Sequence, residues 1–561
     1  MSPSRGTAAV YYHPDAFQIQ RADLKGRHSA GAGFLGGMAR HLDAPDLFTM
    51  AATRPLAEQF AGQVREANPS RVVRWIPADH LERMETVGNL SVPDPNLAAH
   101  AWRRRAFGQR RYGITGITHT ICSNGTIDGM AEALIAPVQL WDAVVCTSTV
   151  ARRVIEGMFD RWSDYLGTRT GGRPLTRPQL PVIPLGVEAD LFDPPDAAAL
   201  RAGLRAKLCL AEDDVVVLFF GRLSFHAKAH PMPMFLGLEE AARRSSRRIV
   251  LMMTGRFAND GIAVEFQQGM QRWCPSVRTV TVDGADDADS RASWFAADLF
   301  TSLSDNIQET FGLTPIEAMA AGLPVVATDW NGYRDTVAHG ETGILVPTTM
   351  PDPGSGHAIM DPYTEGRLSY DRYIGAISQC TAVDARACAE AYLQLAEDAD
   401  LRRRMGAAGR RRVRERYDWR VIIAAYQTLW GELDARRRTD PESAQPEDRA
   451  PTHPLRADPF EAFGCYPTHT LDDGTRLALN TADPDGALID RLSLGMNSFA
   501  MPLICTGEDC RTVLHHLQAA GETTLEAVAA LDPARSAALR RASAWLLKQD
   551  LVTARRATDE N

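Results

Sequence analysis

The sequence predicts an α/β fold of two successive parallel sheets, followed by a smaller and mostly helical region. Short apolar runs rich in β-branched residues alternate with amphipathic stretches from residue 8 to residue 347, which is typical of parallel sheets covered by helices. A polar, proline-rich stretch at 439–451 then interrupts this pattern and indicates a linker. A chain of 561 residues has room for about three to four domains.

The first half of the chain contains five short apolar runs that predict strands. These are Ala8–His13, Leu47–Ala51, Arg71–Ile76, Trp141–Thr147 and Leu180–Pro184. Gly31, Gly33 and Gly36 follow the first run and precede a helical pattern, so we expect them to form a turn. Such a turn either lets a phosphate approach the backbone or packs a helix closely on the sheet. The acidic residue of a dinucleotide site is missing about 20 positions further on, so NAD binding is not predicted.

The second half opens with the strand Val215–Leu223, and Arg222 stands at its carboxyl end, where α/β sheets bind ligands. Lys228 follows before a helix that begins near Met232. A planar guanidinium and a compact ammonium would together neutralise a diphosphate, and the alternative is a pair of surface cations. Further strands are expected at Arg248–Gly255, Val277–Gly284, Ala296–Leu303 and Leu323–Thr328.

Residues 309–328 combine a helix start with two carboxylates. Thr314, Pro315 and Glu317 have the pattern of a capping box with proline at the first helical position, and Gly322 is expected to end the helix. The backbone N–H groups at this helix start lie at the positive end of the helix dipole and can bind a phosphate. They belong to Phe311, Gly312, Leu313 and Thr314.

The two carboxylates of this segment have two interpretations. Glu309 would accept hydrogen bonds from the hydroxyls of a sugar, and Glu317 from those of a ribose, which together with a bound phosphate suits a nucleotide-sugar. In the simpler interpretation, Glu317 caps its own helix and Glu309 is a solvated loop carboxylate. The residues alone leave this choice open.

The composition excludes several functional classes. A net charge of −9 argues against general nucleic-acid binding, and no apolar run approaches the length of a membrane span. Residues 1–6 contain no apolar signal-peptide core. The nine cysteines lack zinc-ligand spacing, Cys505 and Cys510 being their only close pair, and are expected to be reduced and inert. We therefore expect a cytoplasmic protein whose membrane contact, if any, is peripheral.

The segment Glu309-Thr-Phe-Gly-Leu-Thr-Pro-Ile-Glu317, followed by Ala-Met-Ala-Ala-Gly-Leu-Pro-Val-Val, resembles the donor-site motif of the family 4 retaining glycosyltransferases. The run Gly-Arg-Leu at Arg222 with the later Lys228 also resembles that family, although Ala229 stands where the family has glycine. The resemblance covers about residues 8–436.

Some parts of the chain match this family pattern less closely. Val182–Phe192 resembles the family's junction between the two halves, with Leu185 in place of asparagine and Glu188 in place of aspartate. The first half is similar mainly in its glycine-rich stretch and in His119. The match is strongest for Arg222, Lys228 and residues 304–347.

The resemblance implies a GT-B fold, in which two Rossmann-like domains face each other across the active site. The nucleotide-sugar donor binds the second domain and the acceptor mostly the first. By the same resemblance, His119 contacts the reacting sugar and the turn with Gly31 and Gly33 faces the donor. Arg222 and Lys228 stabilise the leaving diphosphate, while Glu309 positions the sugar; neither a cofactor nor a metal ion is expected.

We accordingly expect an acceptor-side domain at 1–185, a nucleotide-sugar domain at 186–415, a crossover helix at 416–438 and a linker at 439–454. Residues 348–375 are expected to form an insertion or an ordered loop. Residues 455–561 lie outside the resemblance and are expected to form an accessory helical module, with a winged-helix-like fold as one option. This module has no basic recognition helix, which leaves a protein partner or a packing appendage as its interpretations.

The predicted function is that of a retaining hexosyltransferase using a nucleoside-diphosphate sugar. One alternative is a nucleotide-sugar epimerase on the same fold, which would isomerise a sugar without an acceptor. The other is a non-catalytic protein that binds a sugar-nucleotide or acts as a scaffold. The sequence does not indicate the sugar, the nucleotide, the acceptor (a glycan, a lipid-linked sugar or a small molecule) or the oligomeric state.

Overall fold

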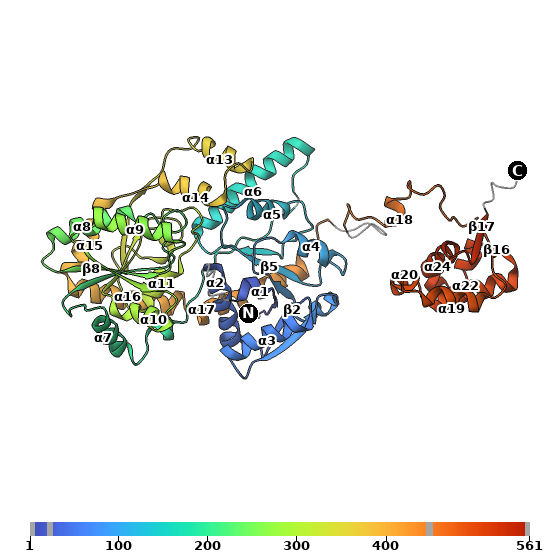
Figure 1. The fold of residues 1–561 in the computed structure, drawn as a ribbon, viewed down its shortest axis with the longest axis horizontal. Helices are drawn as coiled ribbons and strands as arrows, with labels where there is room; N and C mark the ends of the chain where they lie inside the picture. Colours follow the sequence, from blue (N-terminus) through green and yellow to red (C-terminus); the bar gives the residue numbers. More distant parts are fainter. Residues whose placement is uncertain (1–5, 19–25, 175, 445–452, 556–561) are drawn as a thin grey trace. The chain divides into compact units, whose positions relative to one another are not determined.

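The computed structural model describes residues 6–18, 26–174, 176–444 and 453–555. The chain divides into two compact units, Met1–Thr452 and His453–Asn561 (Figure 1). The first unit contains both predicted parallel sheets, and the second contains the predicted accessory module. Residues 1–5 and 445–452, which include most of the N-terminus and part of the predicted linker, lie outside the described residues.

The N-terminal sheet is parallel, and its six strands lie in the order β3-β2-β1-β4-β5-β6. Their bounds are β1 Ala9–Tyr11, β2 Asp46–Ala51, β3 Val72–Pro77, β4 Asn89–Ser91, β5 Gly113–Ile117 and β6 Ala143–Val145. The helices are α1 Pro14–Phe17, α2 Gly26–His41, α3 Arg54–Ala67, α4 Ala98–Arg105, α5 Asn124–Glu132 and α6 Thr149–Thr170, with a 3-10 helix at Leu81–Thr86. The expected strand at Leu180–Pro184 forms only isolated bridges beside β6.

The second sheet repeats this topology, because its order β12-β11-β10-β7-β8-β9 has the same sequence of crossovers and is also parallel. The strands are β7 Val215–Phe220, β8 Ile249–Gly255, β9 Arg278–Asp283, β10 Leu299–Ser302, β11 Val325–Thr328 and β12 Gly343–Val346. The helices are α7 Ala197–Lys207, α8 Met232–Arg244, α9 Asp260–Trp273, α10 Asp287–Ala296, α11 Leu313–Ala320, α12 Tyr333–Thr336, α15 Ala385–Glu397 and α16 Ala399–Arg416, with a 3-10 helix at Ala189–Phe192.

Both sheets therefore have Rossmann-like topology, which confirms the predicted fold class. The strand order reverses between β1 and β4 in the first sheet and between β7 and β10 in the second. In open α/β sheets, ligands bind outside the carboxyl ends of the strands at such a reversal. The loops after β7 and β10 are the ones that carry Lys228 and Glu309.

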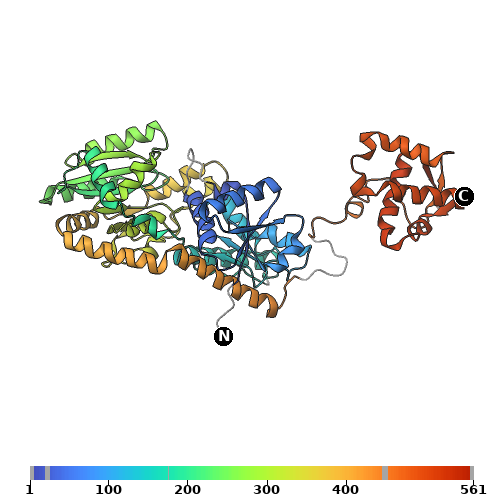
Figure 2. The same ribbon diagram turned by 90° about the horizontal axis from the view of Figure 1, so that it is seen from below.

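Helix α17, Trp419–Thr439, follows α16 and packs on the N-terminal domain (Figure 2). Its buried face includes Trp419, Tyr426 and Trp430, which lie in one apolar cluster with residues of α2 and α3. At the junction, the N–H of Val187 donates to the carbonyl of Tyr417, and the N–H of Trp419 donates to the carbonyl of Val187. The chain thus crosses back to its first domain at this point.

The predicted glycine-rich turn is wrong, because Gly31, Gly33 and Gly36 all lie inside α2. A Cβ atom on Gly31 would lie 1.9 Å from the carbonyl oxygen of Ala16. A Cβ atom on Gly33 would lie 3.0 Å from Cζ2 of Trp419. Gly31 and Gly33 let α2 approach α1 and α17 closely, whereas the packing interpretation of the sequence placed the helix against the sheet. A donor-binding role for Gly31 and Gly33 stays a prediction.

The predicted capping box is also wrong, because α11 begins at Leu313 and its N-cap is Gly312, with φ of 89°. The Tyr333 ring lies against Gly312, where a Cβ atom would be 2.1 Å from Cε1 of that ring, so only glycine fits this turn. Thr314 is then inside the first turn, and its buried hydroxyl has no hydrogen-bond partner among the described residues. Gly322, with φ of 83°, follows the helix end as predicted.

The predicted insertion at 348–375 contains helices rather than a loop. After β13 (Thr348–Thr349) come α13 (His357–Thr364) and α14 (Tyr370–Gln379), and β14 (Ala382–Val383) then pairs with β13. Figure 1 shows both helices on the same side of the unit as α5 and α6. The hydroxyl of Tyr370 lies 3.3 Å from the Thr120 hydroxyl and 3.3 Å from the Cys122 sulfur, so α14 contacts the N-terminal domain.

The C-terminal unit combines helices with an antiparallel sheet of order β16-β15-β17. The strands are β15 Arg476–Leu479, β16 Glu522–Thr524 and β17 Val552–Arg555. The helices are α18 Pro459–Ala462, α19 Pro484–Ser493, α20 Gly495–Ser498, α21 Met501–Ile504, α22 Gly507–Ala520, α23 Leu525–Ala529 and α24 Ser536–Lys548, with a 3-10 helix at Pro533–Arg535. None of the described helices in either unit is both long and apolar enough to span a bilayer.

Candidate functional site

Lys228 and Glu309 form an ion pair at the reversal point of the second sheet. Lys228 lies in the loop after β7, and Glu309 lies in the loop between β10 and α11. The Lys228 Nζ atom is 2.8 Å from Oε2 of Glu309, and the side chains are 17% and 18% exposed. The two strands are neighbours, so residues 81 positions apart in sequence meet at one edge of the sheet.

Hydrogen bonds join these two loops and fix the ion pair in place. The Asn306 side chain donates to the carbonyl of His226 at 2.7 Å, and the Ser304 hydroxyl donates to the carbonyl of Lys228 at 3.3 Å. The Gln308 amide also donates to the carbonyl of Ala227. The position of the Lys228 backbone is therefore set by the segment that leads to Glu309.

The ion pair keeps both groups charged despite their burial. Burial acts to lower the pKa of Lys228, but the neighbouring charge of Glu309 outweighs it and the pKa is raised above the usual lysine value. Burial likewise acts to raise the pKa of Glu309, whereas Lys228 and a backbone N–H of Phe311 lower it below the usual glutamate value. A cation and a carboxylate are thus held ready at neutral pH.

Arg222 adds a second cation to this site. It lies in the loop directly after β7 and is exposed, with a guanidinium N–H donating to the carbonyl of Ala227 at 3.4 Å. Its charge is close enough to lower the pKa of both Lys228 and Glu309. Two cations after β7 and one carboxylate after β10 therefore lie at the carboxyl ends of neighbouring strands.

The start of α11 borders the same cluster. The N–H of Phe311 donates to Oε1 of Glu309 at 3.4 Å, and the helix begins two residues later at Leu313. Glu317 lies in the second turn of the helix, where burial raises its pKa to about 7 and the charge of Lys228 partly offsets the effect. Lys228, Glu309, Glu317 and the first N–H groups of α11 thus surround one location.

His119 approaches this location from the N-terminal domain. It follows β5, and its Nε2 atom is 3.0 Å from the carbonyl oxygen of Pro93. Its own carbonyl accepts a hydrogen bond from the hydroxyl of Thr310, the residue after Glu309. The Ser148 hydroxyl donates to the carbonyl of Thr310 at 2.7 Å. The carboxyl ends of both sheets therefore meet at the segment that holds Glu309.

Thr310, Asp305 and Tyr333 were not singled out from the sequence. Thr310 joins the domains, as described above. Asp305 is buried in the loop after β10, accepts a hydrogen bond from the N–H of His230, and has its pKa raised to about 7 by burial. Tyr333 packs on Gly312, and its hydroxyl lies 2.7 Å from that of Ser302. The run Ser-Asp-Asn directly after a buried strand was the available signal for Asp305.

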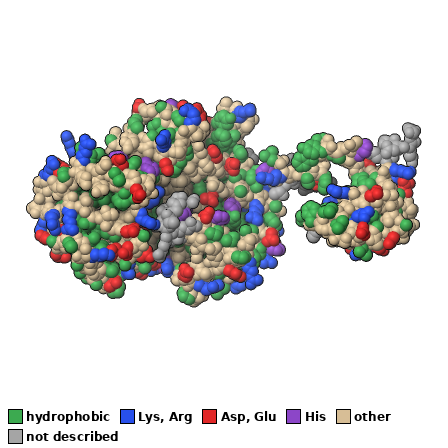
Figure 3. All heavy atoms as spheres, viewed as in Figure 1, with side chains coloured by type: hydrophobic (Ala, Val, Ile, Leu, Met, Phe, Trp, Pro, Cys, Tyr) green, Lys and Arg blue, Asp and Glu red, His purple; other side chains and the backbone are tan. Residues whose placement is uncertain are grey.

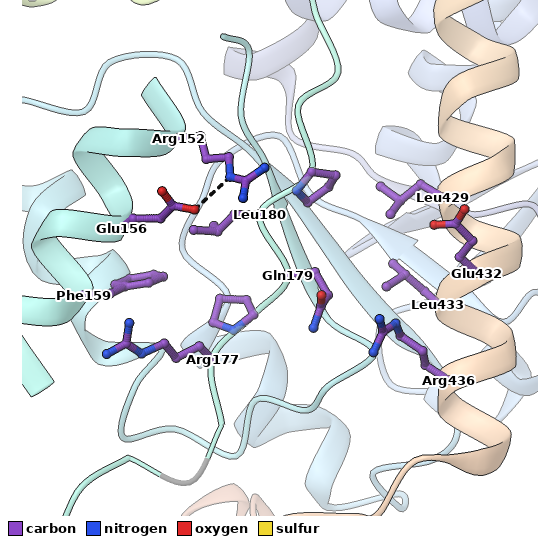
Figure 4. Close-up of a pocket in the computed structure, with 12 residues that line it drawn as sticks. Arg152, Glu156, Phe159, Arg177, Gln179, Leu180, Leu429, Glu432, Leu433 and Arg436 are labelled. Atoms are coloured by element: carbon purple, nitrogen blue, oxygen red, sulfur yellow. Dashed lines mark hydrogen bonds and ion pairs between the residues drawn. The ribbon is translucent and has the colours of Figure 1, made fainter. Parts of the chain in front are cut away.

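One pocket of the first unit lies away from this cluster. A pocket of about 430 Å³ separates α6 from α17 beside residues 177–181 and contains none of the predicted site residues (Figure 4). Its Arg152 is paired with Glu156 at 2.8 Å. By contrast, the space lined by Gly31, Thr115 and His119 measures about 30 Å³, enough for water rather than for a substrate. Among the described residues, no group of three or more His, Cys, Asp or Glu side chains could hold a metal ion.

Two Rossmann-like domains facing each other, with the charged cluster between their carboxyl edges, define a GT-B protein. Residues 214–354 match the family described as Glycosyl transferases group 1. That segment includes Arg222, Lys228, Glu309 and Glu317, so the chain carries a domain of this family.

Curated relatives with the same kind of activity in their names match part of the chain. D-inositol 3-phosphate glycosyltransferase of Xylanimonas cellulosilytica is 30% identical over 260 residues, which are 46% of this chain and 52% of that protein. Phosphatidyl-myo-inositol mannosyltransferase of Mycobacterium tuberculosis is 32% identical over 150 residues, 26% of this chain and 31% of that protein. The chain thus matches about half the length of the former and less of the latter.

Two solved structures are similar to the larger part of the chain. HepE of Anabaena, in complex with UDP and glucose, has 17% identity and a TM-score of 0.48, over 75% of this chain and 98% of that one. A glycosyltransferase from Rickettsia africae has 14% identity and a TM-score of 0.49, over 76% and 98%.

Proposed function

We propose that this protein is a retaining glycosyltransferase that moves a hexose from a nucleoside-diphosphate sugar to an acceptor. The observation that carries the proposal is the cluster of Lys228, Arg222 and Glu309 at the start of α11, opposite His119. Cations beside the N–H groups of a helix start suit a diphosphate, and a half-buried carboxylate next to them suits sugar hydroxyls. These groups lie in the segment that matches the glycosyltransferase family.

The donor would replace the ion pair between Lys228 and Glu309. The diphosphate oxygens accept hydrogen bonds from the ammonium of Lys228, the guanidinium of Arg222 and the N–H groups of residues 311–314. Glu309 is then released to accept hydrogen bonds from the sugar and to orient its anomeric carbon, which is a positioning role. His119 contacts the sugar from the other domain, and Glu317 accepts from the ribose.

In the reaction we propose, the bond between the anomeric carbon and the diphosphate oxygen breaks, and the diphosphate leaves with both bonding electrons. Lys228, Arg222 and the helix N–H groups stabilise the charge that develops on that oxygen. The acceptor hydroxyl forms its bond on the same face, and its proton passes to the leaving phosphate oxygen. This route retains the anomeric configuration and requires neither a metal ion nor a separate base.

The names of the relatives suggest which substrates to try first. Both curated relatives carry inositol in their names, and one solved neighbour binds UDP and glucose. We therefore propose an inositol-bearing polyol as the first acceptor and UDP-glucose and GDP-mannose as the first donors. GDP, ADP and other UDP sugars complete the panel.

The test is a transfer assay in buffer containing a metal chelator, with the anomeric configuration of the product read by NMR. Lys228→Ala should lower turnover by about two orders of magnitude or more, as the loss of one oxyanion donor can. Lys207→Ala is the matched control, because Lys207 lies exposed at the end of α7 and pairs with Asp289. Near-normal turnover in folded Lys228→Ala would refute the proposed role.

The same assay separates the two alternatives. An epimerase would convert the donor sugar without any acceptor, and a binding or scaffold protein would bind the nucleotide without consuming the donor. At a ligand concentration a hundred times its dissociation constant, binding stabilises a folded protein by about 2.7 kcal/mol, so a thermal-shift panel detects either case. Transfer to an acceptor with retention is the outcome that supports the proposed function.

A further inference from the structure

Two thiols of the C-terminal unit lie in direct contact. The sulfur atoms of Cys505 and Cys510 are 3.7 Å apart, and both thiols are free. Cys505 is 4% exposed and Cys510 is fully buried. This unit lies outside the segment matched by the glycosyltransferase family, and the proposed transfer reaction uses neither residue.

The local sequence fixes this contact. Thr506 is the N-cap of α22 and forms a capping box with Asp509. Cys505 therefore precedes the N-cap and Cys510 is the fourth residue of the helix. Side chains at these two positions regularly pack on each other, and apolar residues normally fill them. In this chain, the positions of the hydrophobic staple are occupied by two cysteines.

The surroundings favour a thiolate on Cys505. Cys510 can donate its S–H to Cys505, and this hydrogen bond is the main cause that lowers the pKa of Cys505 and raises that of Cys510. Burial and the negative charge of Asp509 act to raise the pKa of Cys505, and the positive charges of Arg541 and Arg535 act to lower it. The helix N-terminus adds a further positive field, as in many reactive cysteines.

We propose that Cys505 and Cys510 form a reversible disulfide that is made by hydrogen peroxide or a similarly small peroxide. The Cys505 thiolate attacks one peroxide oxygen, the O–O bond breaks, and hydroxide leaves, which gives a sulfenic acid. Cys510 then attacks the Cys505 sulfur, the S–S bond forms, and the S–O bond breaks with loss of water. Two thiols lose two electrons in total, and one peroxide is reduced to two molecules of water.

The geometry requires only a local movement. A disulfide needs its sulfur atoms about 2.05 Å apart, so the two sulfurs must approach by less than about 2 Å. Cys505 is the C-cap of the four-residue helix α21, which lies within an uncharged stretch at 492–507. Oxidation would fasten the end of α21 to α22.

The segment fastened in this way carries exposed apolar side chains. Met496, Phe499 and Leu503 are 77%, 83% and 85% exposed. Figure 3 shows apolar side chains gathered on this unit. The disulfide would add a covalent link at the end of the helix that carries Leu503.

The test uses the full chain, because both cysteines fall in one tryptic peptide, Leu492–Arg511. The native protein is treated with hydrogen peroxide and then denatured in the presence of an alkylating reagent. It is digested with trypsin, and the peptide masses are measured by mass spectrometry. We expect this peptide to lose the mass of two hydrogen atoms and to take up no alkyl group. If the oxidised protein is reduced with dithiothreitol before alkylation, the peptide should instead carry two alkylated cysteines.

Variants distinguish a specific pair from general oxidation. In Cys510→Ser the disulfide peptide should be absent and Cys505 should accumulate as sulfenic or sulfinic acid. Cys465→Ser is the matched control, because Cys465 is an exposed thiol of the same unit and its removal should change nothing. The proposal is overturned if wild-type peptide 492–511 keeps two alkylatable thiols at a peroxide concentration that oxidises Cys465. Disulfides between Cys465 and either residue would overturn it as well.

Discussion

Glu317 offers a test in which stability and ligand binding should move in opposite directions. Burial in the second turn of α11 raises the pKa of this carboxyl to about 7 from its ordinary 4.5. The folded chain therefore holds the proton more tightly than the unfolded chain does. The stabilisation that the folded chain gains from this tighter proton binding is present in full below pH 4.5. It is lost as the pH rises through about 7.

The substitution Glu317→Gln keeps the shape of the side chain and removes the charge. At about 1.4 kcal/mol for each pH unit of pKa difference, the variant should gain up to about 3 kcal/mol over wild type at pH 8. At pH 5 its advantage should be below about 1 kcal/mol, because the wild-type carboxyl is then mostly protonated when folded.

The assay is urea unfolding of the full chain at both pH values, with Glu265→Gln as the control on the exposed face of α9. An equal change in unfolding free energy at the two pH values would refute the argument from burial. Nucleotide affinity, measured by calorimetry, should meanwhile fall about tenfold through the loss of charge-assisted hydrogen bonds to the ribose. Unchanged affinity would show that Glu317 does not contact the nucleotide.

Two further substitutions test the frame around the site. The carboxylate oxygens of Asp142 lie 2.5 and 2.7 Å from the buried guanidinium of Arg104. Asp142→Ala removes this carboxylate and leaves a buried charge without its partner. The free energy of unfolding of the first unit, measured in urea, should therefore fall by about 3–5 kcal/mol. A loss below about 1 kcal/mol would contradict this. Tyr370→Phe removes the hydroxyl that lies between α14 and residues 118–124. The contact between α14 and the N-terminal domain should weaken by about 1 kcal/mol. Faster amide hydrogen exchange in 118–124, compared with wild type, is the expected result, and unchanged exchange there would count against the bridge.

The sequence predicted the second sheet better than the first for a physical reason. A continuous apolar run such as Val215–Phe220 is typical of a strand buried on both faces of a parallel sheet, so it predicts one structure. The strands β4 and β5 were missed because neither has a continuous apolar run: β4 reads Asn-Leu-Ser and β5 reads Gly-Ile-Thr-Gly-Ile. Gly116 in β5 is required by a tertiary contact, since a Cβ atom there would lie 2.5 Å from the carbonyl oxygen of Asp94.

The helix starts also show that a local sequence pattern does not report tertiary contacts. Thr314-Pro-Ile-Glu317 has every local feature of a capping box, but the structure begins α11 at Leu313. The decisive contact is the Tyr333 ring against Gly312, which comes from a residue 21 positions away. At Thr506 the local pattern had no such competitor, and the capping box formed.

The sequence by itself determined the two Rossmann-like sheets and the segment that carries Glu309 and Glu317. These follow from hydrophobic period and from chemistry within a few residues along the chain. Only the tertiary structure decided that the glycines of α2 serve helix packing, that Lys228 pairs with Glu309, and that Thr310 joins the two domains. Each of those depends on contacts between residues distant in sequence, for which a single chain carries no local signal.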